Sequence, residues 1–237
     1  MELVTTFSLA FVGGLVPALV WLWFFLREDR DRPEPHLLIL LAFLAGMLSV
    51  IVALVLESLS LNLPFVVHGT LATIILWAFI EEFVKWALAA VTVLWRPFDD
   101  EPIDPVIYMI TVALGFSALE TALFLLGPIF DADITNAIVT GNLRFLGAAL
   151  VHVVSSAAIG FALGFAFYHR REVQYVALVI GIILATALHA LFNFLIMTLQ
   201  GPAAMYAFLF VWASIVGMLL AFERIKQVGT SLFASRT

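Results

Sequence analysis

Long apolar runs separated by short polar segments make up most of the chain. Each run holds about 20 residues or more, which is the length that an α-helix needs to cross the hydrocarbon core of a bilayer. The pattern predicts about seven membrane-spanning helices, at roughly 5–26, 37–56, 68–95, 105–126, 143–168, 173–199 and 203–222. Proline or glycine marks several connections, for example Gly201 and Pro202. The predicted fold class is all-α: one polytopic helical bundle over residues 1–237.

Composition supports a membrane domain and excludes several functions. Hydrophobic residues occupy 64% of the 237 positions, and the chain contains no cysteine. Disulfide and thiol chemistry are therefore excluded. The net charge of −6 argues against a nucleic-acid partner, because such a partner requires a basic surface. The expected partners are the lipid bilayer and a membrane-protein or membrane-proximal peptide.

The basic residues predict the orientation of the bundle. Nine of the eleven lie in alternate connections: Arg27, Arg30, Arg32, Arg96, Arg170, Arg171, Arg224, Lys226 and Arg236. Basic residues are retained on the cytoplasmic side of a membrane. This predicts a multi-pass membrane protein with its N-terminus outside and its C-terminus in the cytoplasm.

A few ionisable residues lie within the predicted spans, where each costs about 2.5 to 3.5 kcal/mol to insert. They are Glu81, Glu82, Lys85, Glu120, His152 and His189, and Asn193 adds an amide. Four others lie near span ends and are expected to be boundary residues: Glu57, His68, Arg144 and His169. At 1.5 Å per residue, the first set falls about 9 to 21 Å below the outer ends of four helices. A shared layer favours one site over scattered packing residues.

Helical spacing relates these residues to each other. Lys85 lies angularly between Glu81 and Glu82, so it can neutralise one carboxylate and leave the other as a general base. His189 and Asn193 are four residues apart on one helix face, where they suit the stabilisation of an oxyanion. Ion pairing between helices and interhelical hydrogen bonds are the structural alternatives.

His152 and Glu120 are the remaining members of the set. His152 lies on a face of small residues, where it can pack or orient a water molecule. Glu120 has no cation within a turn of its own helix, so its partner is expected from another span, with His152, His189 and Lys85 as candidates. Carboxylates, imidazoles and an amide together form a hydrolytic set.

Four ordered motifs resemble those of the PrsW family of bacterial intramembrane proteases, which is similar to the CAAX prenyl-endopeptidases and bacteriocin-processing membrane proteases. The motifs are Glu81-Glu82-x-x-Lys85, Tyr108 with Gly115-Phe116-x-Ala118-x-Glu120, Arg144 with His152 and Gly160, and His189-x-x-x-Asn193. The resemblance covers residues 77–194, within an expected catalytic core at about 71–199. Thr121 departs from the family pattern, which has asparagine after the glutamate.

The resemblance implies an endopeptidase that cleaves a peptide bond in or near the membrane, such as the first cleavage of an anti-sigma factor. It implies that Glu81 and His152 activate water, that His189 and Asn193 line the oxyanion site, and that Glu82 is a supporting carboxylate paired with Lys85. Glu120 and Arg144 are expected to support these residues.

The chemistry leaves two questions open. A metal-independent glutamate mechanism is expected, because the sequence neighbours of the histidines offer few acceptors to hold their rings. Zinc or another divalent metal on Glu81, His152 and His189 is the alternative. A proton- or ion-coupled transporter or channel is the rival function, since buried Glu, Lys and His also serve proton relays.

Overall fold

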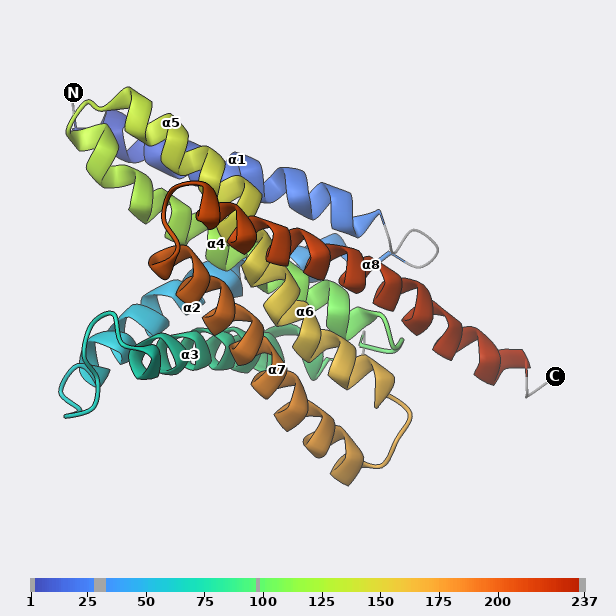
Figure 1. Ribbon diagram of the computed structural model, residues 1–237. Coiled ribbons are helices and arrows are strands. Elements are labelled where there is room, and N and C mark those ends of the chain that lie inside the picture. Colours follow the sequence, from blue (N-terminus) through green and yellow to red (C-terminus); the bar gives the residue numbers. More distant parts are fainter. Residues whose placement is uncertain (1–2, 28–32, 97–98, 235–237) are drawn as a thin grey trace.

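The computed structural model describes residues 3–27, 33–96 and 99–234, and in these ranges the chain is helical with no strand (Figure 1). The α-helices are α1 (Leu3–Leu26), α2 (His36–Ser60), α3 (Leu71–Ala89), α4 (Asp104–Phe130), α5 (Ile134–Leu143), α6 (Ala149–Phe165), α7 (Arg171–Thr198) and α8 (Met205–Ala234). Two π-helical turns, Ala90–Leu94 and Arg144–Ala148, and a 3₁₀ turn, Gly201–Ala204, complete the described helices. The all-α membrane bundle expected from the sequence is confirmed.

Six stretches of helix are long and apolar enough to cross a membrane. The remaining predicted span, 68–95, corresponds to α3, which carries three charged residues in its second half and therefore differs from the other six. Helix α3 contains 19 residues and the π-helical turn that follows adds 5. Together they form about 36 Å of helix at 1.5 Å per residue. Its length is thus sufficient, and the number of spans and their orientation stay predictions.

The fifth predicted span begins earlier than expected. The helix runs without interruption from Ile134 to Phe165, through the π-helical turn that starts at Arg144. Its first ten residues look like a connection because they include Asn136, Thr140 and Asn142. Their side chains bond locally instead, as when Asn142 Nδ2 donates to the Ile138 carbonyl at 2.8 Å. Arg144 therefore lies inside a continuous helix, and its place at the membrane boundary stays a prediction.

Helix α4 forms the centre of the bundle, and every residue from Asp104 to Ala118 is buried. Close approach to α2 depends on two glycines. A Cβ atom added to Gly115 would lie 2.0 Å from the Phe43 carbonyl oxygen, and one added to Gly46 would lie 2.0 Å from the Val112 carbonyl oxygen. The backbones of α2 and α4 therefore touch at these two positions.

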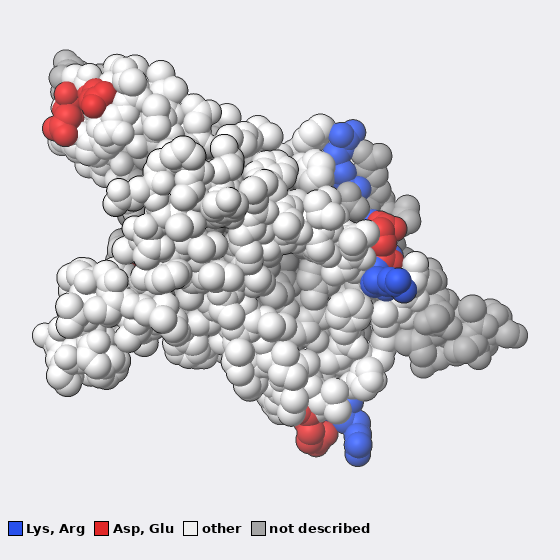
Figure 2. Space-filling view, viewed as in Figure 1, with Lys and Arg blue, Asp and Glu red and all other residues white. Residues whose placement is uncertain are grey.

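The outer surface is that of a protein in lipid. Many large apolar side chains are about half exposed or more, among them Val4, Trp23, Leu40, Ile51, Val179 and Leu209. Figure 2 shows a broad uncharged belt on one face, with Lys and Arg gathered toward the end where α1 ends and the α6–α7 turn lies. Acidic side chains alone mark the opposite end of this face. This distribution agrees with the alternation from which the orientation is predicted.

Candidate active site

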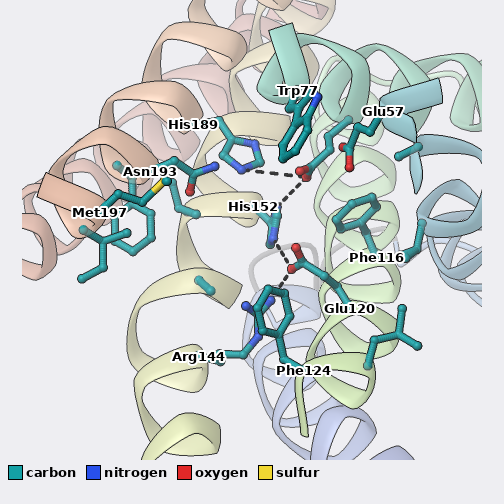
Figure 3. A pocket seen from close by; sticks show the side chains of 18 of the residues that line it. Glu57, Trp77, Phe116, Glu120, Phe124, Arg144, His152, His189, Asn193 and Met197 are labelled. Atoms are coloured by element: carbon teal, nitrogen blue, oxygen red, sulfur yellow. Dashed lines mark hydrogen bonds and ion pairs between the residues drawn. The ribbon is translucent and has the colours of Figure 1, made fainter. Parts of the chain in front are cut away.

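A cavity of about 630 Å³ opens between α2, α3, α4, α6, α7 and α8. Its walls are largely apolar, with contributions from Leu54, Phe124, Ile196 and Phe208. Figure 3 shows its polar residues, which come from different helices and point inward: Glu57, Glu120, Arg144, His152, His189 and Asn193. Glu81 also lines this cavity. A concave apolar site with a few convergent polar groups is the usual form of an active site.

Lys85 is the buried cation at the base of the cluster, and its side chain is completely inaccessible. Its ammonium group donates to Glu82 Oε1 at 2.8 Å and lies 3.5 Å from Glu81 Oε2. It also lies 4.0 Å from the centre of the Phe116 ring, a favourable cation–π distance. Lys85 thus sits between the two carboxylates as the helical spacing predicts, and it pairs more closely with Glu82.

His152 is held between a cation and a carboxylate. Lys85 Nζ lies 2.9 Å from Nδ1, and Nε2 lies 2.9 Å from Glu120 Oε2. Because an ammonium group only donates and an ionised carboxylate only accepts, Nε2 carries the proton and Nδ1 presents a lone pair. The expectation that Glu120 finds a partner on another helix is met by His152.

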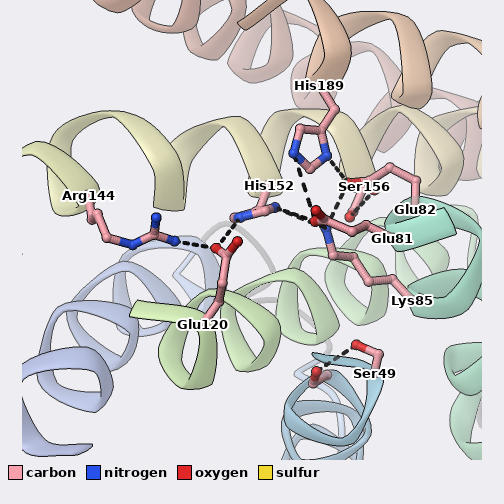
Figure 4. A network of polar contacts seen from close by, with 10 residues as sticks. Ser49, Glu81, Glu82, Lys85, Glu120, Arg144, His152, Ser156 and His189 are labelled. Atoms are coloured by element: carbon pink, nitrogen blue, oxygen red, sulfur yellow. Dashed lines mark hydrogen bonds and ion pairs between the residues drawn. The ribbon is translucent and has the colours of Figure 1, made fainter. Parts of the chain in front are cut away.

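Arg144 is a second partner of Glu120 that the sequence analysis did not foresee. Its guanidinium bonds to the Glu120 carboxylate through Nη2, and its Nε donates to Thr121 Oγ1 at 3.0 Å. Thr121, which departs from the family pattern, therefore acts as an acceptor that orients the arginine. In Figure 4 these contacts form one end of a polar chain that runs from Arg144 through Glu120 and His152 to the α3 carboxylates.

His189 forms the other end of this network. Its Nδ1 lies 2.9 Å from Glu82 Oε1, so Nδ1 donates to the carboxylate and Nε2 is left as an acceptor. Glu82 Oε2 also accepts a hydrogen bond from Ser156 Oγ at 2.6 Å. Glu82 is thus fully enclosed by Lys85, His189 and Ser156.

Three acceptor atoms converge on the cavity side of this network. Glu81 Oε2 lies 3.8 Å from both His152 Nδ1 and His189 Nε2, and all three atoms lie within 4.8 Å of one another. Glu81 Oε2 is buried and has no hydrogen-bond partner in the described part of the chain. In a tetrahedral site with bonds of about 2.0–2.2 Å, ligand atoms lie roughly 3.4 Å apart. The set therefore fits a divalent metal after a small contraction.

The expected lack of acceptors around the histidines is wrong. Glu120 holds His152 and Glu82 holds His189, each through the ring nitrogen that faces away from Glu81. Carboxylates behind metal-binding histidines are the usual support of such ligands. The sequence reasoning considered only neighbours in the same helix, whereas both acceptors come from other helices. A metal at this site is therefore plausible.

One feature of the site competes with a metal. The lone pair of His152 Nδ1 that faces Glu81 also accepts from Lys85 Nζ, so a metal ion and the ammonium group cannot use it at the same time. Lys85 has Glu82 as its other partner at 2.8 Å. Metal binding would thus replace one of the contacts of Lys85 and leave the closer one available.

Asn193 reaches the same cavity from α7 but stays apart from the network. It lines the wall one turn from His189 (Figure 3) and makes no side-chain hydrogen bond to any described residue. Its amide is thus free to contact a ligand. Two further lining residues, Glu57 and Trp77, were not singled out from the sequence. Glu57 had been assigned to the membrane boundary, and its position near the end of α2 gave no other signal.

Comparison with known proteins finds a matching family model and several similar proteins. The model of the "PrsW family intramembrane metalloprotease" matches residues 34–220. Relatives named "Protease PrsW" include those of Geobacillus kaustophilus, 28% identical over 78% of this chain and 78% of the relative, and Bacillus subtilis, 27% identical over 79% and 83%. A third, from Clostridioides difficile, is 25% identical over 79% of each chain. No solved structure matches. The transporter alternative finds no support in these comparisons.

Proposed function

Because the chain belongs to the PrsW family and is a multi-pass bacterial intramembrane endopeptidase, we propose that Glu81, His152 and His189 hold a divalent metal ion at its active site. The observation that carries this proposal is the convergence of three acceptor atoms, one of them a buried carboxylate oxygen without a hydrogen-bond partner in the described part of the chain. Two imidazoles and a carboxylate are a ligand set suited to zinc. When bound, such a metal would activate water and polarise the scissile carbonyl.

The other polar residues act by holding these three in place. Glu120 fixes the ring and tautomer of His152, and Arg144 pairs with Glu120 and orients it. Glu82 does the same for His189, with Lys85 supplying its countercharge. Each histidine thus has its own carboxylate, and each carboxylate has its own cation. This arrangement leaves Glu81 as the group that faces the cavity without a close partner.

Asn193 is the proposed oxyanion donor. Its amide lies on the cavity wall beside His189 and has no competing hydrogen bond in the described structure. A fixed amide donor in a site with apolar walls stabilises the negative charge that develops on a carbonyl oxygen during hydrolysis. The peptide bond is thus expected to bind between Asn193 and the Glu81 side of the cavity.

Cleavage of a membrane-spanning substrate tests the assignment. Purified protein would be incubated with single-span bacterial proteins, with an anti-sigma factor as the first candidate substrate. Glu81→Gln, His152→Ala and His189→Ala should each abolish cleavage while the protein still folds. Glu223→Gln, on the exposed surface of α8, is the matched control and should cleave like the parent. Parent-level cleavage by any of the first three would remove that residue from the mechanism.

A further inference from the structure

Glu57 is a carboxylate within the bundle that no residue of the described chain neutralises. It lies three residues before the end of α2, is half-buried, and lines the same cavity as Glu81. Figure 3 shows its carboxyl group directed into the cavity. Its side chain makes no hydrogen bond or ion pair with any described residue. An ionisable side chain at such a place is by default a functional group.

The cations near the cavity are already in use. Arg144 is paired with Glu120 at one side, and Lys85 is enclosed by Glu82 and His152 behind the wall. Neither can leave its partner without exposing another buried carboxylate, which is costly. A cation that pairs with Glu57 must therefore come from a molecule that enters the cavity.

Trp77 provides an aromatic surface on the same side of the cavity (Figure 3). Its indole Nε1 donates to Ser60 Oγ at 3.1 Å, and the His68 ring packs edge-on at 5.3 Å. Ser60 Oγ in turn donates to the Glu57 carbonyl at 2.6 Å. The same serine thus ties the tryptophan side chain to the backbone of Glu57, so the indole ring has a fixed position relative to that part of α2.

A carboxylate beside a fixed tryptophan, with apolar walls, suits a long cationic side chain. The ring attracts the charge, the carboxylate pairs with it, and the neighbouring Ala53 and Leu54 can cover the methylene groups. We propose that Glu57 and Trp77 form a specificity subsite that binds a lysine or arginine side chain of the substrate close to the scissile bond. This rests on the proposed function, because the subsite lies in the cavity that contains Glu81, His152 and His189.

The first test measures binding without catalysis. Hexylguanidinium would be titrated into the purified full-length protein in detergent, and the midpoint of thermal unfolding followed. Hexanol is the uncharged probe, and Glu223→Gln is the matched control variant. Hexylguanidinium should raise the midpoint of the parent and of the control, and should bind Glu57→Gln about tenfold more weakly. Equal titration curves for the parent and Glu57→Gln would overturn the proposal.

The second test measures selectivity. Single-span peptides would carry Lys, Met or Glu at each position around the cleavage site. The parent should prefer Lys over Met about tenfold, mainly through KM. Glu57→Gln should lose this preference, and Glu57→Lys should favour Glu. A preference that Glu57→Lys leaves unchanged would refute the subsite. Cleavage of the peptides by Glu81→Gln would instead refute the proposed active site, and the hexylguanidinium titration would still decide the subsite.

Discussion

Replacing Lys85 with methionine should destabilise the protein far more than breaking the same kind of ion pair on the surface. Lys85 lies 2.8 Å from Glu82 in an i, i+3 pair whose side chains are both 0% exposed. Lys226 lies 3.0 Å from Glu223 in the same sequence relation on α8, with side chains 34% and 66% exposed. The pairs match in chemistry and spacing and differ in burial.

The difference in burial sets the expected loss in the free energy of unfolding for each variant. Methionine in place of Lys85 removes the only cation between Glu81 and Glu82 and leaves the His152 lone pair unsatisfied. Breaking a buried pair in this way costs about 3 to 5 kcal/mol in the free energy of unfolding. An exposed pair such as Lys226 with Glu223 contributes about 0 to 1 kcal/mol.

Unfolding of both variants would be measured by titration with a denaturing detergent in mixed micelles, with a chelator present so that no divalent cation replaces the lost charge. Lys85→Met should lose about 3 kcal/mol or more. Lys226→Met should stay within about 1 kcal/mol of the parent. Equal losses in the two variants would show that the buried network does not depend on Lys85 as described.

Two further predictions concern packing and pH. Gly115→Ala should lower the free energy of unfolding by about 3 kcal/mol or more, because its Cβ would lie 2.0 Å from a backbone carbonyl oxygen of α2. Gly217→Ala is the control, since it has open space around it and should not destabilise the fold. Equal unfolding midpoints for the two variants would contradict the close contact of α2 and α4. Burial, with the charges of Glu34 and Asp100, raises the pKa of Asp99 from 3.8 to about 7, so the native state favours the protonated form and stability is lost as pH rises through that range. Asp99→Asn should flatten the dependence of the unfolding midpoint on pH between about 4 and 8, and parallel curves for parent and variant would contradict it.

The hydrophobic pattern was sufficient for the helical fold because each span is long enough to be recognised by itself. The pattern failed where polar residues satisfy themselves within a helix. Asn136 and Asn142 look like loop residues, yet they belong to α5, where Asn136 Oδ1 accepts from Thr140 Oγ1 and Asn142 Nδ2 donates to the Ile138 carbonyl. Arg144 was consequently placed at the membrane boundary and not in the cavity wall.

The residues of the candidate site could be selected from the sequence because charged groups are rare within membrane spans. Which of these residues contact one another could not be predicted in the same way. The contacts of Glu82 with His189 and of Glu120 with His152 join residues 107 and 32 positions apart, so they depend on how the helices pack. The place of Glu57 in the cavity was missed for a related reason: only the packed bundle shows that it lines the same cavity as Glu81.

The proposal that Glu81, His152 and His189 form a metal-dependent active site is tested most directly by measuring the divalent metal bound to purified protein that cleaves a single-span substrate. The expected result is about one metal ion per chain in the parent, as for a catalytic site with three protein ligands. His152→Ala and His189→Ala should lose that metal while the protein remains folded. Full cleavage by parent protein that contains no bound metal, unchanged by a chelator, would contradict the metal site and return the reaction to Glu81 as a metal-independent general base.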